Sequence, residues 1–143
     1  RGERIARRSQ GETPDAATSV LLVDTMGELM RFYAAADVAF VGGSLVPIGG
    51  HNLLEPAALG VPVLTGPHLA NFEDIAATLR EAQALREVDD ASALGDALVA
   101  LADDPEARRG LGAAGEAVVD ANRGALEATL AGIAARLPAT PTR

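Results

Sequence analysis

Short apolar runs alternate with helical segments along most of this chain, and this alternation limits the fold more than any other feature. The runs "SVLLV", "VAFVGG" and "VPVLTG" are continuous and rich in β-branched residues, which is typical of strands buried on both faces of a sheet. Residues 27–36, between the first two runs, carry apolar residues at helical spacing. This alternation predicts an α/β fold with a parallel, Rossmann-like sheet and helices on both of its faces.

The second half of the chain is predicted to be mainly helical. "ALREV" fits an edge strand, and no strand pattern follows it. Asp104 and Pro105 are the residue types favoured at an N-cap and at the first helical position. We expect one domain over residues 1–137, ending in helices, and a disordered tail over residues 138–143. The last predicted helix carries Leu126, Leu130, Ile133 and Leu137.

The composition argues against several classes of site. The formal net charge of −8 disfavours a nucleic-acid-binding surface and binding to anionic lipid. The chain has no cysteine and only two histidines, which excludes a disulfide framework and makes a metal site unexpected. No apolar run approaches the ~20 residues that span a bilayer, and no signal peptide is visible, so we expect a soluble cytoplasmic chain.

A glycine-rich loop separates the second and third predicted strands. It reads "GGSLVPIGGHNLLEPAALG", and a short helix is predicted over residues 52–59. Gly49 and Gly50 would let a ligand approach the first N–H groups of that helix, where phosphate commonly binds. His51 and Asn52 could add side-chain donors.

Glu55 in the first turn of this helix extends the prediction to a nucleotide. Its carboxylate can accept two hydrogen bonds from a ribose diol, as acidic residues do in dinucleotide-binding folds. In the alternative reading, the glycines only form a tight turn and Glu55 only complements the helix dipole. The loop has no G-x-G-x-x-G pattern and no Walker lysine, so NAD binding and NTP hydrolysis are poorly supported.

Two further segments are expected at the same rim, because ligands bind beyond the carboxyl ends of parallel strands. In "DTMGEL", Asp24 either caps the following helix or contacts ligand, and residues 27–29 form a helix start. In "GPHLANF", Asn71 is predicted to be an N-cap, and His68 either contacts substrate or is structural. Ser44, His68 and Asn71 are the candidate substrate contacts.

The segments "RRSQGE", "VDTMGEL" and "DVAFVGGSLVPIGGHNLLEPAALGVPVLTGPH" resemble the C-terminal part of the 3-deoxy-D-manno-octulosonic acid (Kdo) transferases of lipopolysaccharide assembly. The resemblance covers residues 7–72. It implies a two-domain GT-B glycosyltransferase, with residues 1–137 forming part of its nucleotide-sugar-binding domain. The implied reaction transfers Kdo from CMP-Kdo to the lipid A precursor lipid IVA at the cytoplasmic face of the inner membrane, without a metal or other cofactor.

The resemblance also implies site residues. The catalytic base would lie in an N-terminal domain that this chain lacks, so the isolated chain is expected to be inactive. Contacts to the lipid A precursor and to the membrane would likewise come from that missing part. CMP would be held by Gly27, Glu28, Leu29, Asn52, Leu53, Leu54 and Glu55, next to the predicted phosphate loop of Gly49, Gly50 and His51.

The sequence alone leaves two other functions open. The chain could be a non-catalytic module that binds CMP or a partner protein. It could also be the donor domain of another GT-B transferase that uses a UDP-sugar. The fold alone does not separate these functions, since one fold hosts many reactions.

Overall fold

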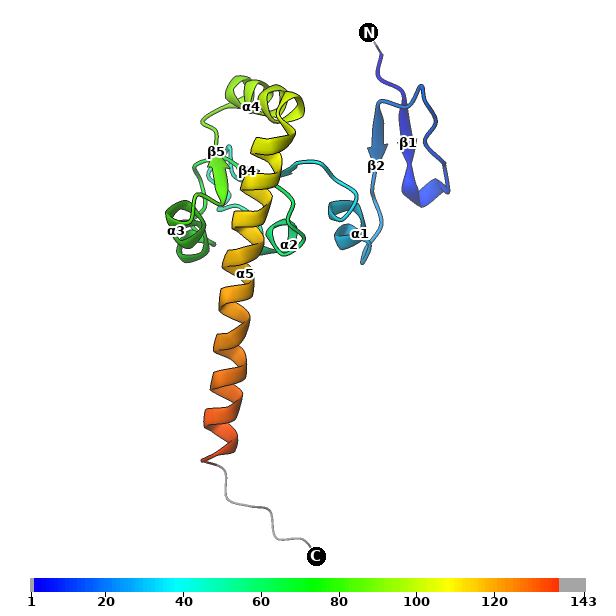
Figure 1. Cartoon of the computed structure of the whole chain (residues 1–143). Helices are drawn as coiled ribbons and strands as arrows, with labels where there is room; N and C mark the ends of the chain where they lie inside the picture. Colours follow the sequence, from blue (N-terminus) through cyan, green and yellow to red (C-terminus); the bar gives the residue numbers. More distant parts are fainter. Residues whose placement is uncertain (1, 137–143) are drawn as a thin grey trace, which may run out of the picture. The chain divides into compact units, whose positions relative to one another are not determined.

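A computed structural model describes residues 2–136, except for the side chains of residues 125–127. The tail predicted over residues 138–143 and Leu137 lie outside the described residues. The chain divides into two compact units, Arg1–Phe32 and Tyr33–Arg143 (Figure 1).

The first unit is a small parallel sheet. Strand β1 (Ile5–Arg7) pairs with β2 (Val20–Leu22), with Arg7 opposite Leu22. A short 3₁₀ helix, η1 (Arg8–Gln10), follows β1, and helix α1 (Leu29–Tyr33) follows β2. The prediction that the strand formed by "SVLLV" is buried on both faces is wrong, because Val20 and Leu22 of β2 are 41% and 39% exposed. Two strands and one short helix are too few elements to cover both faces of a sheet.

The second unit contains the main sheet. Strands β3 (Ala39–Val41), β4 (Val63–Thr65) and β5 (Leu85–Glu87) are parallel and lie in that order, with β5 at an edge as predicted. The strands of the chain therefore form two parallel sheets rather than the single sheet predicted. The α/β class and the parallel pairing are confirmed. The helices of this unit are α2 (Leu54–Ala57), α3 (Glu73–Glu81), α4 (Ala91–Asp103) and α5 (Pro105–Ala134).

Helices cover both faces of the β3–β4–β5 sheet. Successive side chains of a strand point to opposite faces, and β4 shows this clearly. Val63 packs with buried residues of α2 and α3 and with α5, whereas Leu64 packs with Ala97 and Leu101 of α4. Val63 and Leu64 are fully buried. Burial of such an apolar side chain stabilises a fold by about 1.5–3 kcal/mol.

Helix α5 begins where the sequence predicted and is a single element of 30 residues. The Asp104 carboxylate accepts hydrogen bonds from the backbone N–H groups of Glu106 (3.0 Å) and Ala107 (2.9 Å), and Pro105 opens the helix. The predicted last helix is the continuation of this element. Its later turns extend beyond the rest of the second unit (Figure 1) and expose Leu130 and Ile133.

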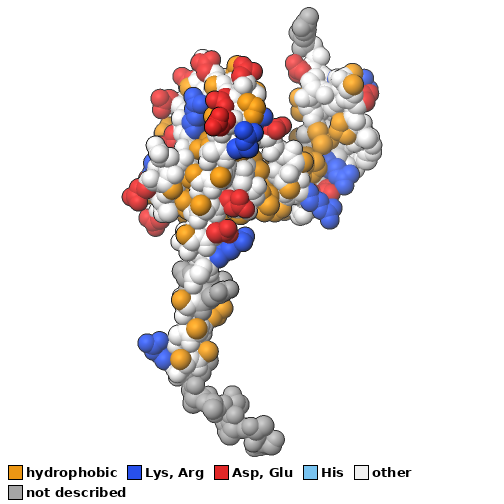
Figure 2. Space-filling view, in the orientation of Figure 1, with side chains coloured by type: hydrophobic (Ala, Val, Ile, Leu, Met, Phe, Trp, Pro, Cys, Tyr) orange, Lys and Arg blue, Asp and Glu red, His pale blue; other side chains and the backbone are white. Residues whose placement is uncertain are grey.

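The surface agrees with the acidic composition. Acidic side chains are spread over the region of α3 and α4 on the face shown in Figure 2. Among residues 2–136, no helix has both the length and the apolar character needed to cross a bilayer.

Candidate functional site

The loops after β3 and β4 are hydrogen-bonded to each other. The N–H of Gly50 donates to the carbonyl of Gly43 (2.9 Å) within the first loop. The N–H of His68 donates to the carbonyl of Ser44 (2.9 Å), and the N–H of Asn71 donates to that of Gly49 (3.1 Å). The glycine-rich loop and the "GPHLAN" segment therefore share one rim of the β3–β4–β5 sheet, as predicted.

Gly49 and Gly50 are required by packing as well as by backbone conformation. Their φ angles are +104° and +76°, a region that favours glycine. A Cβ on Gly49 would collide with the side chain of Asn71, and one on Gly50 would lie 2.7 Å from Cδ2 of Leu69. The N–H of Gly50 is already bonded within the loop, so the predicted phosphate contact depends on other N–H groups near this helix start.

The segment that leads into α2 is organised by Asn52. Its Oδ1 accepts a hydrogen bond from the N–H of Leu54 (3.0 Å), and its Nδ2 donates to Oε1 of Glu55 (3.3 Å). Glu55 is half-buried, and no ion pair to it occurs in the described part of the chain. Because a carboxylate has about four acceptor positions, Glu55 keeps capacity for a ligand.

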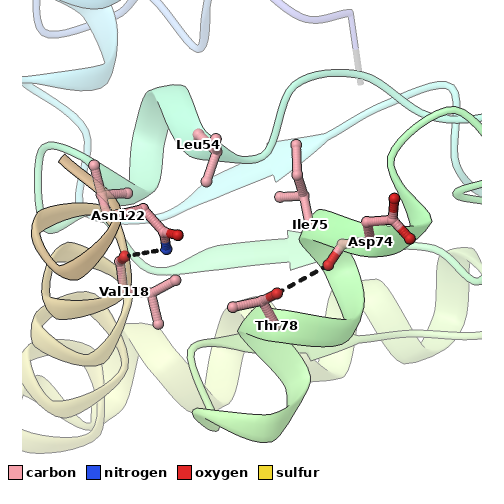
Figure 3. A pocket seen from close by; sticks show the side chains of 7 residues that line it. Leu54, Asp74, Ile75, Thr78, Val118 and Asn122 are labelled. Carbon is pink, nitrogen blue, oxygen red and sulfur yellow. Dashed lines mark hydrogen bonds between the residues drawn. The ribbon is translucent and has the colours of Figure 1, made fainter. Parts of the chain in front are cut away.

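The two leucines between Asn52 and Glu55 contribute their side chains to the interior of the unit. Leu53 is fully buried in the core beside the sheet. Leu54 lines an apolar cavity of about 300 Å³ between α2, α3 and α5, opposite Ile75 and Val118 (Figure 3). A ligand contact at Leu53 would therefore come from its backbone.

Two of the three polar side chains beside this cavity, Thr78 and Asn122, are bonded within their own helices. Thr78 donates to the carbonyl of Asp74 (2.9 Å), and Asn122 donates to the carbonyl of Val118 (2.8 Å) (Figure 3). The Thr78 hydroxyl and one N–H of the Asn122 amide are thus engaged, and four of the seven lining side chains are apolar, so the cavity presents a mainly apolar surface.

In the first unit, the predicted helix start at residues 27–29 is held by its acidic residue. The Glu28 carboxylate accepts hydrogen bonds from Nη2 and Nε of Arg8 (2.7 and 3.1 Å) and from Oγ1 of Thr25 (2.7 Å). The Arg8 hydrogen bond, followed by the Thr25 bond, lowers the pKa of Glu28 to about 2. Gly27 has a φ of +80° and open space where a Cβ would point.

Of the two alternatives for Asp24, the structure tests only the helix cap. It accepts hydrogen bonds from the backbone N–H (2.9 Å) and the hydroxyl (2.8 Å) of Ser9, and Arg7 lies 3.8 Å away. The backbone bond from Ser9 is the main cause of a lowered pKa of Asp24. The expectation that Asp24 caps the following helix is wrong, because its bonds go to the turn after β1.

Two of the three candidate substrate contacts are at the surface. Ser44 is fully buried, donates to the carbonyl of Val41 (2.7 Å) and accepts from the N–H of Gly66 (2.8 Å), so it does not reach a ligand. His68 and Asn71 are exposed and line a cavity of about 340 Å³.

Asn71 is not the N-cap of α3. Phe72 occupies that position, without a side-chain cap bond. The Asn71 amide instead lies 3.5 Å from the carbonyl oxygen of Ile48, and its backbone N–H is bonded to the glycine loop. The residue therefore links the two loops of the rim.

Sequence reasoning missed Arg8, Ser9 and Thr25. Arg8 and Glu28 are 20 residues apart, and Ser9 and Asp24 are 15 apart, so no local pattern joins them. One signal was present in the sequence. In each pair, one residue follows β1 and the other follows β2, and these two strands pair in parallel.

Residues 27–29 belong to the first unit and residues 52–55 to the second. Within the described residues, no group of three or more His, Cys, Asp or Glu could hold a metal ion.

Comparisons with known proteins assign the chain to a family, although no family model matches it. It is 51% identical over 128 residues to the 3-deoxy-D-manno-octulosonic acid transferase of Haemophilus influenzae, covering 89% of this chain and 30% of that protein. The corresponding transferase of Bordetella pertussis is 46% identical over 131 residues, covering 90% of this chain and 30% of that protein. The chain thus spans about 30% of the length of these curated relatives.

A solved structure agrees with these relatives. The C-terminal CMP-Kdo binding domain of WaaA from Acinetobacter baumannii has a TM-score of 0.79 and 42% identity to this chain, over 82% of this chain and 61% of that domain. Sequence identity, fold and motifs agree, and we conclude that the chain belongs to the 3-deoxy-D-manno-octulosonic acid (Kdo) transferase family and corresponds to its C-terminal part.

Proposed function

We propose that this chain is the donor-binding part of an enzyme that transfers Kdo from CMP-Kdo to the lipid A precursor lipid IVA, releasing CMP. One observation carries the proposal: the chain shares 42% identity and its fold with a domain described as CMP-Kdo binding. The transferases of Haemophilus influenzae and Bordetella pertussis support the same reaction.

Glu55 is the residue proposed to hold the ribose of CMP. Asn52 bonds one carboxylate oxygen, Oε1, and so limits the orientations of the Glu55 side chain. The second oxygen and the remaining lone pairs can accept bonds from a vicinal diol. Asn52 thereby acts on the nucleotide through Glu55, while its own oxygen fixes the start of α2 through the N–H of Leu54.

The phosphate of CMP is proposed to lie against the N–H groups ahead of α2 and the exposed His51. Negative charge grows on this phosphate as the bond to Kdo breaks, and fixed N–H donors stabilise that charge in the transition state. Helix α2 has only four residues, so its dipole is small and individual hydrogen bonds would supply most of the effect.

The base of the nucleotide is proposed to contact residues 27–29. Because the Glu28 carboxylate is already bonded to Arg8 and Thr25, we expect the backbone of these residues to make the contact. Gly27 adopts a conformation that other residues rarely adopt and leaves open space beside it.

The chemical step needs groups outside this chain. In the proposed enzyme, an acceptor hydroxyl attacks the anomeric carbon of Kdo with inversion, and a base in the N-terminal domain removes the proton of that hydroxyl. The acceptor and the cytoplasmic face of the inner membrane would be contacted by that domain as well. We therefore predict that the isolated chain binds donor without catalysing transfer, and Kdo transfer by these 143 residues would refute this.

Isothermal titration calorimetry with CMP, UMP and inorganic phosphate tests the proposal. We expect CMP to bind more tightly than UMP or phosphate. Glu55→Ala should weaken CMP binding about ten- to a hundred-fold, since hydrogen bonds to charged groups contribute roughly 1.5–3 kcal/mol. Glu81→Ala, an exposed glutamate at the end of α3, is the matched control and should bind as the unsubstituted chain does.

Each other result has a defined meaning. Tighter binding of UMP would favour a transferase that uses a UDP-sugar. A folded chain that binds none of the three would contradict the proposal and favour a module that binds a partner protein.

A further inference from the structure

Two hydrogen-bonded pairs connect the turn after β1 with the loop after β2. Arg8 holds Glu28 through two hydrogen bonds, and Ser9 holds Asp24 through two more. Strands β1 and β2 run parallel and end in register, with Arg7 opposite Leu22. Both connections therefore leave the same edge of this sheet, and adjacent residues of the turn reach two points of the loop.

The Arg8–Glu28 pair constrains orientation more than a single contact would. Nε and Nη2 of Arg8 contact different oxygens of the carboxylate, a bidentate arrangement that fixes the planes of both groups. Thr25 donates a third bond to the same carboxylate. The loop of residues 24–28 is thus anchored at Asp24 and again at Glu28.

We propose that Arg8 is a positioning residue for nucleotide binding: it holds Glu28 so that the backbone of residues 27–29 is fixed before CMP arrives. The inference rests on the function proposed above. Fixing a binding loop in advance raises affinity because less conformational entropy is lost when the ligand binds. Arg8 was assigned no role from the sequence, and it acts here through Glu28 rather than on the ligand.

Gly27 makes such anchoring useful. Its φ of +80° lies where glycine is favoured, and a Cβ built on it meets no atom within 4 Å. Glycine is the most flexible residue of the unfolded and loosely held backbone. The hydrogen bonds from Arg8 and Thr25 to the adjacent Glu28 restrict the backbone next to this flexible glycine.

A double-mutant cycle measured by calorimetry with CMP tests the proposal. The variants are Arg8→Met, Arg8→Lys, Glu28→Gln and the double variant of Arg8→Met with Glu28→Gln. The matched control is Arg4→Met, which removes a similar ion pair, Arg4 with Asp15 at 2.8 Å, from the other end of β1. NMR spectra of each variant show whether it is folded and report the backbone amides of residues 25–29.

We expect Arg8→Met to weaken CMP binding about three- to ten-fold, because the loop of residues 24–28 must then be ordered when CMP binds. Arg8→Lys should recover part of the loss, and Arg4→Met should bind as the unsubstituted chain does. The double variant should lose no more than Arg8→Met alone. The amides of residues 25–29 should shift in Arg8→Met and stay in place in Arg4→Met.

The titration of Glu28 gives a readout that needs no nucleotide. Arg8 is the main cause of the lowered pKa of Glu28, so the carboxyl signal in Arg8→Met should titrate at a higher pH than in the unsubstituted chain. An unchanged midpoint would contradict the anchoring.

The remaining outcomes separate this inference from the proposed function. Unchanged CMP affinity in Arg8→Met, or additive losses in the cycle, would overturn the positioning role, because additive losses mean that Arg8 contacts CMP directly. If the unsubstituted, folded chain does not bind CMP, the proposed function is refuted and the inference falls with it.

Discussion

Replacing Gly49 with alanine should destabilise the chain through two separable effects. Gly49 has a φ of +104°, and an alanine Cβ there would lie 2.8 Å from Cγ of Asn71 and still closer to its amide nitrogen. The first effect is backbone strain, and the second is displacement of the Asn71 side chain. Gly42, seven residues earlier in the same loop, has neither feature, since a Cβ built there meets nothing within 4 Å.

The magnitude follows from these two contributions. A residue other than glycine at such a φ costs of order 1–3 kcal/mol. Displacing Asn71 removes its contact with the carbonyl of Ile48, which is long at 3.5 Å and exposed, so about 0.5 kcal/mol is lost there. We expect a total near 2–3 kcal/mol, which corresponds to a fall in Tm of roughly 7–10 °C for a chain of this size.

Urea denaturation of Gly49→Ala, Gly42→Ala, Asn71→Ala and the double variant of Gly49→Ala with Asn71→Ala measures this prediction. Gly49→Ala should lower the free energy of unfolding by the stated amount, whereas Gly42→Ala should change it by less than about 0.5 kcal/mol. In an Asn71→Ala background, Gly49→Ala should be less harmful, because the collision is removed and only the strain remains. Equal stability of Gly49→Ala and Gly42→Ala would refute the reasoning.

The same variant separates two explanations of the glycine. If Gly49 is needed for the fold, through its positive φ and its contact with Asn71, Gly49→Ala loses stability in the absence of nucleotide. If it is needed only to let phosphate approach the backbone, the variant keeps its stability and loses affinity for CMP. The φ of +104° and the contact with Asn71 favour the first explanation.

Three further predictions concern the core, a helix cap and the effect of acid. Leu64→Ala should cost about 2–5 kcal/mol by leaving a cavity under α4, whereas Leu98→Ala, at a side chain 39% exposed, should cost about 0.5 kcal/mol, both measured by urea denaturation. Asp104→Ala should cost about 1 kcal/mol, because two N–H groups at the start of α5 lose their acceptor, and the Tm would report it. The stabilisation contributed by Glu28 should be lost as the pH falls from about 4.5 to about 2, its ordinary and folded pKa values. Melting curves across this range should show a smaller acid effect in Arg8→Met.

The sequence predicted the elements better than the contacts between them, and the two helix caps show why. Asp104 and Asn71 are both favoured cap residues ahead of an apolar pattern. Asp104 forms its cap because its partners lie within three residues. The N–H of Asn71 is instead bonded to the carbonyl of Gly49, 22 residues earlier in the chain. This long-range bond sets the backbone at Asn71, and no local rule includes it.

The candidate site shows the same limit. The residue types near Glu55 predicted a carboxylate with capacity for a ligand, and the structure shows that its hydrogen-bond partner Asn52 is only three residues away. Glu28 was read correctly as part of a helix start, but its carboxylate is bonded to Arg8, which lies in the 3₁₀ helix after β1. The sequence could therefore indicate that an acidic group has capacity for a ligand only where the hydrogen-bond partner of that group is close to it in sequence.

The two sets of proposed nucleotide contacts are held by interactions of different strength. Residues 52–55 are anchored by the fully buried Leu53 and by hydrogen bonds within three residues, which salt affects little. Residues 27–29 depend on an ion pair whose Arg8 side chain is 46% exposed, and exposed pairs weaken as salt rises. Residues 27–29 are proposed to contact the base. Loss of Arg8 should therefore reduce the preference for CMP over UMP more than it weakens the ribose contact of Glu55. Base discrimination in this part of the enzyme would then depend on a residue that touches no part of the nucleotide.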